Sequence, residues 1–191
     1  MSVSHIICID SLLYFRAQRV QNLAYALIHA GIKPGDRVAV IAPNSYVHSP
    51  PVCISHLATT HKHRPMIADA HQAVLAARSI ITPINTRLTV PEVTYILQHS
   101  GAKLVLVDHQ FTHLLNSSDR PQVPVIVCKD TGRKDDPYED FLSAGRKFSE
   151  EKGWEGLEAE IDENVAACLC YTSGTTGRVG STPLVSVELL E

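Results

Sequence analysis

Apolar residues follow two patterns that alternate along the chain, one with the period of a helix and one of short continuous runs. Helical periodicity predicts helices at 16–30, 68–78 and 89–101. Apolar runs rich in β-branched residues predict buried strands at 38–42, 80–84, 103–108, 123–128 and 165–171. Thr89 and Glu92 form the pattern of a capping box at the start of the third helix, and Gly101 is placed to end it.

Alternating helices and strands predict an α/β fold with a mainly parallel sheet and flanking helices. Crossovers between parallel strands are almost always right-handed, which limits the topologies available to such a chain. Ligands of open parallel sheets bind in the crevice at the C-terminal ends of the strands. Candidate chemistry is therefore expected where the apolar runs end.

The stretch 129–163 differs in character, because it holds 12 of the 20 acidic residues and 6 of the basic ones. We expect surface turns and amphipathic helices there, with a solvated acidic face. The whole chain has a formal net charge of -3, which gives no electrostatic basis for a nucleic acid partner. No apolar run reaches the roughly 18 residues of a transmembrane segment.

The five cysteines form an odd and scattered set, which favours reduced thiols in an intracellular compartment: Cys8, Cys53, Cys128, Cys168 and Cys170. The last two are expected on one face of a strand, as small buried hydrophobic residues. The N-terminus lacks the basic region of a secretory signal, and the final VELLE is not a peroxisomal or endoplasmic-reticulum address. A cytoplasmic location is the expectation.

A loop rich in hydroxyl groups and glycine follows the last predicted strand. It consists of Thr172, Ser173, Gly174, Thr175, Thr176 and Gly177. Glycines let a backbone approach a ligand closely, and consecutive N–H groups bind anions. The hydroxyls add donors for phosphate and candidate ligands for Mg²⁺. The loop is not a Walker A motif, because no Lys-Ser or Lys-Thr pair follows. These residues alone leave open a polar turn without a ligand.

The run YTSGTTG at 171–177 resembles the signature of the adenylate-forming (AMP-binding) superfamily. Upstream, KPGDRVAVIAPNS and AARSIITPINTRLTVPEVTYILQHSGAKLVLVD are also similar to that superfamily, so the resemblance covers most of 16–45 and 73–178. The chain is most similar to acyl-CoA synthetases of the fatty-acid–CoA ligase type. The resemblance implies that residues 1–191 are an incomplete N-terminal AMP-binding domain of the acyl-CoA synthetase-like fold.

The resemblance also implies an activity, that of an ATP-dependent carboxylate–CoA ligase. A carboxylic acid attacks the α-phosphorus of ATP to give an acyl-adenylate, and the thiol of CoA then displaces AMP. Residues Thr172–Gly177 would hold the ATP phosphates, with ATP, Mg²⁺ and CoA as cofactor and co-substrates. The implied catalytic residues lie downstream of this chain, so no catalytic residue is assigned.

Two departures from the family pattern limit this expectation. The family lysine that follows the loop is replaced by Gly180, and residues 179–191 form a tail unlike the family. Because the downstream pockets and the C-terminal domain are absent, we expect no ligase activity from the chain alone. The alternative is a catalytically inactive remnant that acts at most as a nucleotide-binding or interaction protein, pairing through an exposed sheet edge.

The second departure is a histidine-rich stretch at 46–72, interpreted as an atypical insertion. It contains five of the ten histidines. Cys53, His56, His61 and His63 suggest zinc by residue type, but their spacing matches no established ligand pattern. We therefore expect an irregular surface segment and assign no metal site.

Overall fold

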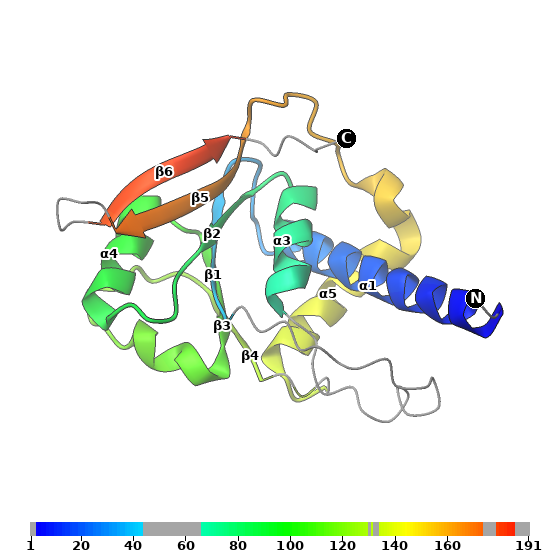
Figure 1. The fold of residues 1–191 in the computed structure, drawn as a ribbon, viewed down its shortest axis with the longest axis horizontal. Helices are drawn as coiled ribbons and strands as arrows, with labels where there is room; N and C mark the ends of the chain where they lie inside the picture. Colours follow the sequence, from blue (N-terminus) through cyan, green and yellow to red (C-terminus); the bar gives the residue numbers. More distant parts are fainter. Residues whose placement is uncertain (1–2, 44–65, 130, 132–133, 174–178, 186–191) are drawn as a thin grey trace.

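The computed structural model describes residues 3–43, 66–129, 131, 134–173 and 179–185, and its core is one six-stranded sheet (Figure 1). The strand order is β4-β3-β1-β2-β5-β6. The strands are β1 (Arg37–Ile41), β2 (Ile80–Pro83), β3 (Leu104–Asp108), β4 (Val125–Cys128), β5 (Ala166–Ser173) and β6 (Val179–Val185). The first five strands pair in parallel, and β6 pairs antiparallel with β5.

The helices lie on both faces of the sheet (Figure 1). They are α1 (Val3–His29), α3 (Met66–Ala76), α4 (Val90–Ser100) and α5 (Pro137–Lys152), with 3₁₀ turns η1 (His109–Leu115) and η2 (Gly153–Gly156). The predicted α/β class and mainly parallel sheet are confirmed. The first helix begins at Val3 rather than at the predicted residue 16. Within the described residues, no helix has the length and apolarity that a bilayer crossing needs.

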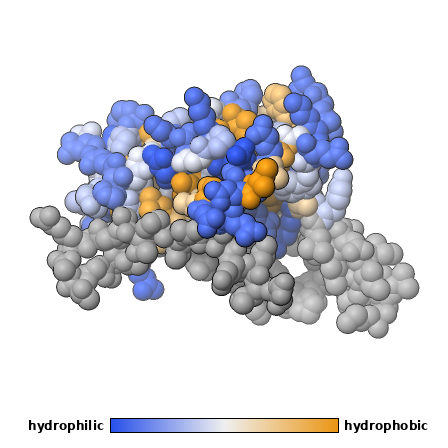
Figure 2. All heavy atoms as spheres, turned by 90° about the horizontal axis from the view of Figure 1, so that it is seen from above, coloured by the Kyte–Doolittle hydropathy of each residue, from blue (hydrophilic) through white to orange (hydrophobic). Residues whose placement is uncertain are grey.

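Side-chain alternation along the strands separates two apolar cores. Val38 and Val40 of β1 face the layer formed by α1, α3 and α5. Ala39 and Ile41 of the same strand face α4 and η1. All four side chains are fully buried, as expected for a central strand covered on both faces. Figure 2, a view from above, shows the remaining apolar surface (orange) interspersed with hydrophilic surface.

The predicted capping signals of α4 are confirmed. The Glu92 carboxylate accepts hydrogen bonds from the backbone N–H and the hydroxyl of Thr89, both at 2.7 Å. These bonds, the backbone one first, lower the pKa of Glu92 below its usual value. At the other end, Gly101 adopts the left-handed conformation with φ of 61°. The strand β3 can therefore start at Leu104, soon after α4 ends at Ser100.

The acidic stretch 129–163 forms the amphipathic helix α5, as predicted, but its inner face packs closely on α1 (Figure 1). Gly145 is buried there, and a Cβ at this position would lie 2.6 Å from the backbone nitrogen of Ala26. The two helix backbones therefore approach each other at a position that only glycine fits.

The first turn of α5 is fixed by Asp136, whose buried carboxylate accepts N–H bonds from Lys129, Thr131 and Tyr138.

A buried ionic cluster joins three helices on this side of the sheet. Arg19 of α1 donates from Nε to Asp69 of α3 at 3.0 Å, and from Nη1 to Glu139 of α5 at 3.0 Å. Its Nη2 lies 3.0 Å from the second carboxylate oxygen of Glu139. This contact is an ion pair but not a further hydrogen bond. The guanidinium also lies over the Tyr138 ring, 5.8 Å from its centroid. The Arg19 guanidinium thus links α1 to both α3 and α5.

Candidate functional site

The residues expected to hold phosphates begin at the C-terminal end of β5. Thr172 and Ser173 are the last residues of this strand, and they pair with Gly180 and Val179 of β6. The other predicted positions, Gly174, Thr175, Thr176 and Gly177, lie outside the described residues. By its sequence position, the loop therefore starts at the edge of the sheet where parallel-sheet ligands bind.

A second polar segment follows β2 at the same edge of the sheet. β2 and β5 are parallel neighbours, with Ile81 beside Cys168, so their C-terminal ends point the same way. Asn85 and Arg87 come just after β2, and both are exposed. The Asn85 side-chain oxygen accepts a hydrogen bond from the Arg87 backbone N–H at 3.0 Å, which shapes the turn. The exposed Arg87 guanidinium places a positive charge on the segment that leaves β2.

Tyr171, directly before the loop, is held by contacts that the sequence did not reveal. Its ring packs on the core beneath α4 and η1. His99 of α4 places Nδ1 2.8 Å from the Tyr171 hydroxyl, with the two rings edge to face. Tyr95 stacks on the other side of His99, at 5.5 Å between ring centroids. Burial raises the pKa of Tyr171, so its hydroxyl stays protonated at neutral pH. His99, itself exposed, therefore ties α4 to the end of β5.

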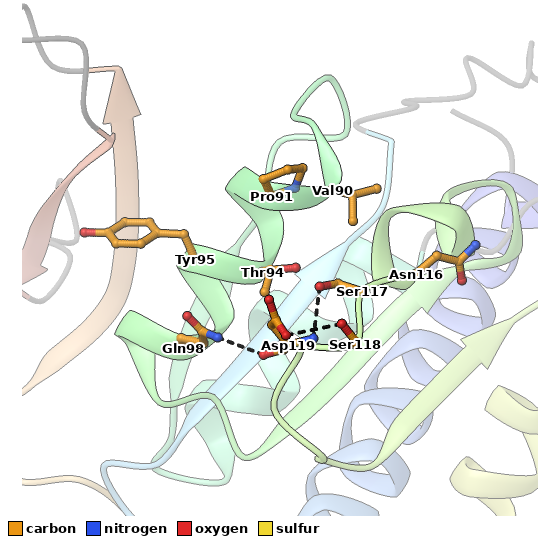
Figure 3. Close-up of a pocket in the computed structure, with 9 residues that line it drawn as sticks. All are labelled: Val90, Pro91, Thr94, Tyr95, Gln98, Asn116, Ser117, Ser118 and Asp119. Carbon is orange, nitrogen blue, oxygen red and sulfur yellow. Dashed lines mark hydrogen bonds between the residues drawn. The ribbon is translucent and has the colours of Figure 1, made fainter.

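A groove of the described residues lies elsewhere, between α4 and the segment 116–119 (Figure 3). It encloses about 490 Å³. Its polar groups bind one another: Gln98 donates to the Asp119 carbonyl at 2.7 Å, and the Asp119 N–H donates to Ser117 at 3.2 Å. Figure 3 shows Tyr95 pointing away from this segment. The groove is therefore a polar seam between two elements, remote from the loop in sequence.

The cysteines and the acidic residues assemble no metal centre in the described part of the chain. Within it, no three side chains of His, Cys, Asp or Glu are arranged to hold a metal ion. Cys53, His56, His61 and His63, considered for zinc, lie outside the described residues. Cys168 and Cys170 share a face of β5 as expected, with Sγ atoms 3.4 Å apart. Both are half-buried rather than buried, because the face of β5 is only partly covered.

Comparison with known sequences identifies the family. Residues 55–179 match the family described as AMP-binding enzyme. The chain is 30% identical over 178 residues to a medium-chain-fatty-acid–CoA ligase of Ectopseudomonas oleovorans, which covers 83% of this chain and 26% of the relative. It is 27% identical to a peroxisomal acetate/butyrate–CoA ligase of Arabidopsis thaliana, over 83% of this chain and 27% of that protein. The chain therefore spans about a quarter of the length of these relatives.

Solved structures share the fold. A fatty acyl-CoA synthetase of Mycobacterium tuberculosis superposes with a TM-score of 0.58 at 21% identity, covering 88% of this chain and 28% of that one. ATP-bound MatB from Rhodopseudomonas palustris superposes with a TM-score of 0.63 at 20% identity, covering 89% of this chain and 28% of that one. The match over residues 55–179, well over half of the chain, shows that this chain belongs to the AMP-binding enzyme family.

Proposed function

We propose that the chain is the upstream part of the N-terminal domain of an ATP-dependent carboxylate–CoA ligase, and that it contributes the loop for the ATP phosphates. Thr172, Ser173, Gly174, Thr175, Thr176 and Gly177 would form that contact. One observation carries the proposal: this hydroxyl- and glycine-rich run leaves the C-terminal end of a strand in a parallel sheet. The overlap with an ATP-bound relative supports the choice of nucleotide.

The residues present suit the recognition of phosphates rather than the later chemistry. Backbone N–H groups freed by Gly174 and Gly177 and four nearby hydroxyls would bind anionic oxygens. Mg²⁺ would be held mainly by the phosphates, with a hydroxyl as an additional ligand. A fatty acid and CoA are proposed as further substrates because the named relatives include CoA ligases of carboxylic acids.

A second candidate function is nucleotide binding without ligation. Gly180 stands where the family has a lysine, and Arg178 is the cation nearest to it along the chain. An arginine is not equivalent to a lysine at such a position, because the planar guanidinium of arginine and the compact ammonium of lysine bind phosphate with different geometry. The chain would then be a remnant that binds ATP or a partner chain through β6, the edge strand of the sheet.

The domain boundaries belong to the same proposal. We propose 1–191 as an incomplete AMP-binding domain, with a histidine-rich insertion at 46–72 and a tail of different origin at 179–191. The end of the family match at residue 179 supports the second boundary. The match begins at 55 and α3 begins at Met66, so both overlap the C-terminal part of this proposed insertion. Free thiols at Cys168 and Cys170 are compatible with a cytoplasmic location.

Exchange of labelled pyrophosphate into ATP separates the two functions. The assay uses the 191-residue chain with Mg²⁺ and a medium-chain fatty acid, and the controls omit the acid. A ligase fragment that retains adenylation would show exchange that depends on the fatty acid. We expect saturable ATP binding without such exchange, because the assayed chain spans only about a quarter of the length of its ligase relatives. Fatty-acid-dependent exchange would overturn the expectation that the chain alone is inactive.

A further inference from the structure

Two thiols stand side by side on β5, next to the main core and outside the proposed phosphate contact. Cys168 packs against the core formed with α1, α3 and α5, and Cys170 is two residues further along the same face. Their Sγ atoms are 3.4 Å apart, and one thiol hydrogen-bonds to the other. Both side chains are free and half-buried, so small molecules in solution can reach them.

The strand geometry favours a bridge through a third atom over a disulfide. Two residues of an extended strand span about 6.6–6.8 Å, at the upper end of the Cα separation that disulfides tolerate. The sulfurs would also have to close from 3.4 Å to about 2.05 Å. β5 resists such shortening because Cys168 pairs with Ile81 and Leu184, and Cys170 pairs with Thr182. An atom that joins the sulfurs at their present spacing leaves these pairs intact.

A tetrahedral zinc ion would need more ligands than β5 supplies. Zinc–sulfur bonds of about 2.3 Å put two thiolates about 3.8 Å apart, close to the spacing seen here. Zinc sites use three or four protein ligands, however, and no third His, Cys, Asp or Glu joins the pair among the described residues. The expected ligand is therefore one that needs only two sulfur atoms from the protein to complete its coordination.

From this geometry we propose that Cys168 and Cys170 form a dithiol site for trivalent organic arsenicals, which bind one arsenic atom across the two sulfurs. In the reaction, an arsenical R–As(OH)₂ condenses with two thiols. Two As–O bonds break, two As–S bonds form, and each thiol proton leaves with a hydroxide as water. Nothing is oxidised or reduced, so no further reactant is needed.

The protonation of the pair suits this reaction. Burial first, and then the hydrogen bond with Cys170, raises the pKa of Cys168 to about 12. The thiol is therefore neutral at physiological pH and reacts slowly with alkylating reagents that need a thiolate. Condensation with an arsenical releases water and leaves no charge on the half-buried face. Selectivity then comes from the spacing of the two sulfurs.

Intact-mass spectrometry with phenylarsine oxide tests the proposal. The wild-type chain is treated with the reagent and then with excess monothiol, which removes arsenic from single cysteines such as Cys8 and Cys53. We expect one arsenical per chain to remain, and a small dithiol to release it. Cys168→Ser and Cys170→Ser should each lose this resistant adduct, whereas the control Cys128→Ser should keep it.

Peptide mapping keeps the test decisive if a variant folds poorly. Digestion of the treated wild-type chain should place the arsenical on the peptide that contains both Cys168 and Cys170. A resistant adduct on another peptide, a resistant adduct that survives in either serine variant, or no resistant adduct in the wild type would overturn the proposal.

Discussion

His99 and Tyr171 lie 72 residues apart in sequence, yet the histidine Nδ1 is 2.8 Å from the tyrosine hydroxyl. This contact ties α4 to the final residues of β5. Among the described residues, β5 and the parallel part of the sheet share a single registered pair, Cys168 with Ile81. The side chain of Tyr171 therefore contributes to the direction in which β5 approaches Thr172.

We expect His99 and Tyr171 to be energetically coupled. Tyr171→Phe keeps the ring and removes the hydroxyl, and His99→Ala removes its partner. A double-mutant cycle on unfolding free energies should give a coupling of about 1 kcal/mol, the usual net value of one hydrogen bond. Urea titrations of the four proteins provide the measurement. Additive single effects would show that the contact stabilises nothing.

The pair Arg19 and Asp69 leads to a prediction about pH. Burial raises the pKa of Asp69 above its usual value, and the nearby Arg19 opposes this effect without cancelling it. A carboxyl group whose pKa is higher in the folded than in the unfolded state stabilises the fold most below the unfolded pKa of about 3.9, where it is protonated in both states. This contribution to the free energy of unfolding is lost as the pH rises through the folded-state pKa. The stability of the wild type relative to Asp69→Asn should therefore fall as the pH rises above about 4.

Unfolding free energies of the wild type and Asp69→Asn between pH 4 and neutral pH provide the measurement. The wild type's relative stability should fall and then level off once Asp69 is fully ionised. A relative stability that grows with pH would show that the Arg19 charge outweighs burial and that the ionised pair is the favoured state.

Gly145 should tolerate no side chain. In Gly145→Ala the new methyl group would lie 2.6 Å from the Ala26 nitrogen and closer to the Asn22 carbonyl oxygen. The backbones of α1 and α5 must then separate, and we expect a loss of about 2–3 kcal/mol despite the better helix propensity of alanine. Thermal unfolding gives the measurement, with the exposed Lys147→Ala as the control. An unchanged melting temperature in Gly145→Ala would contradict the close helix contact.

Asp136 should be the most sensitive position of the segment that precedes α5. Its carboxylate is fully buried and accepts from three backbone N–H groups. Asp136→Ala leaves those donors without their partner, so we expect a loss of about 3 kcal/mol. The neighbouring Asp135→Ala should stay within about 0.5 kcal/mol, because that side chain is exposed. Equal effects of the two substitutions would contradict the assigned role.

Local signals in the sequence predicted much of the fold. Apolar runs located β1 to β5, and the capping pattern at Thr89 with Gly101 located α4 within a residue or two. The early start of α1 was missed because the apolar residues of 3–15 form no helical stripe that distinguishes this segment from an apolar coil. The strand β6 was missed because residues 179–185 were interpreted as a tail, and antiparallel pairing with β5 is a long-range choice.

The candidate site, too, was predictable from the sequence only in part. The loop Thr172–Gly177 was found because its composition and order are distinctive. The contact between His99 and Tyr171 was not, because a single histidine on a helix carries no local sign of its partner. Arg19 and Asp69 were missed for the same reason, since only the packing of α1 on α3 brings the two charges together.

Equilibrium binding of MgATP to the 191-residue chain and to Thr175→Ala/Thr176→Ala tests the central claim, that this loop holds the phosphates. Ser118→Ala, in the groove beside α4, is the matched loss of a hydroxyl elsewhere on the surface. We predict saturable binding to the wild type and to Ser118→Ala, and at least a tenfold weaker affinity in the double variant, about 1.4 kcal/mol. Equal affinity of all three proteins, or no saturable binding to the wild type, would contradict the assignment of the loop.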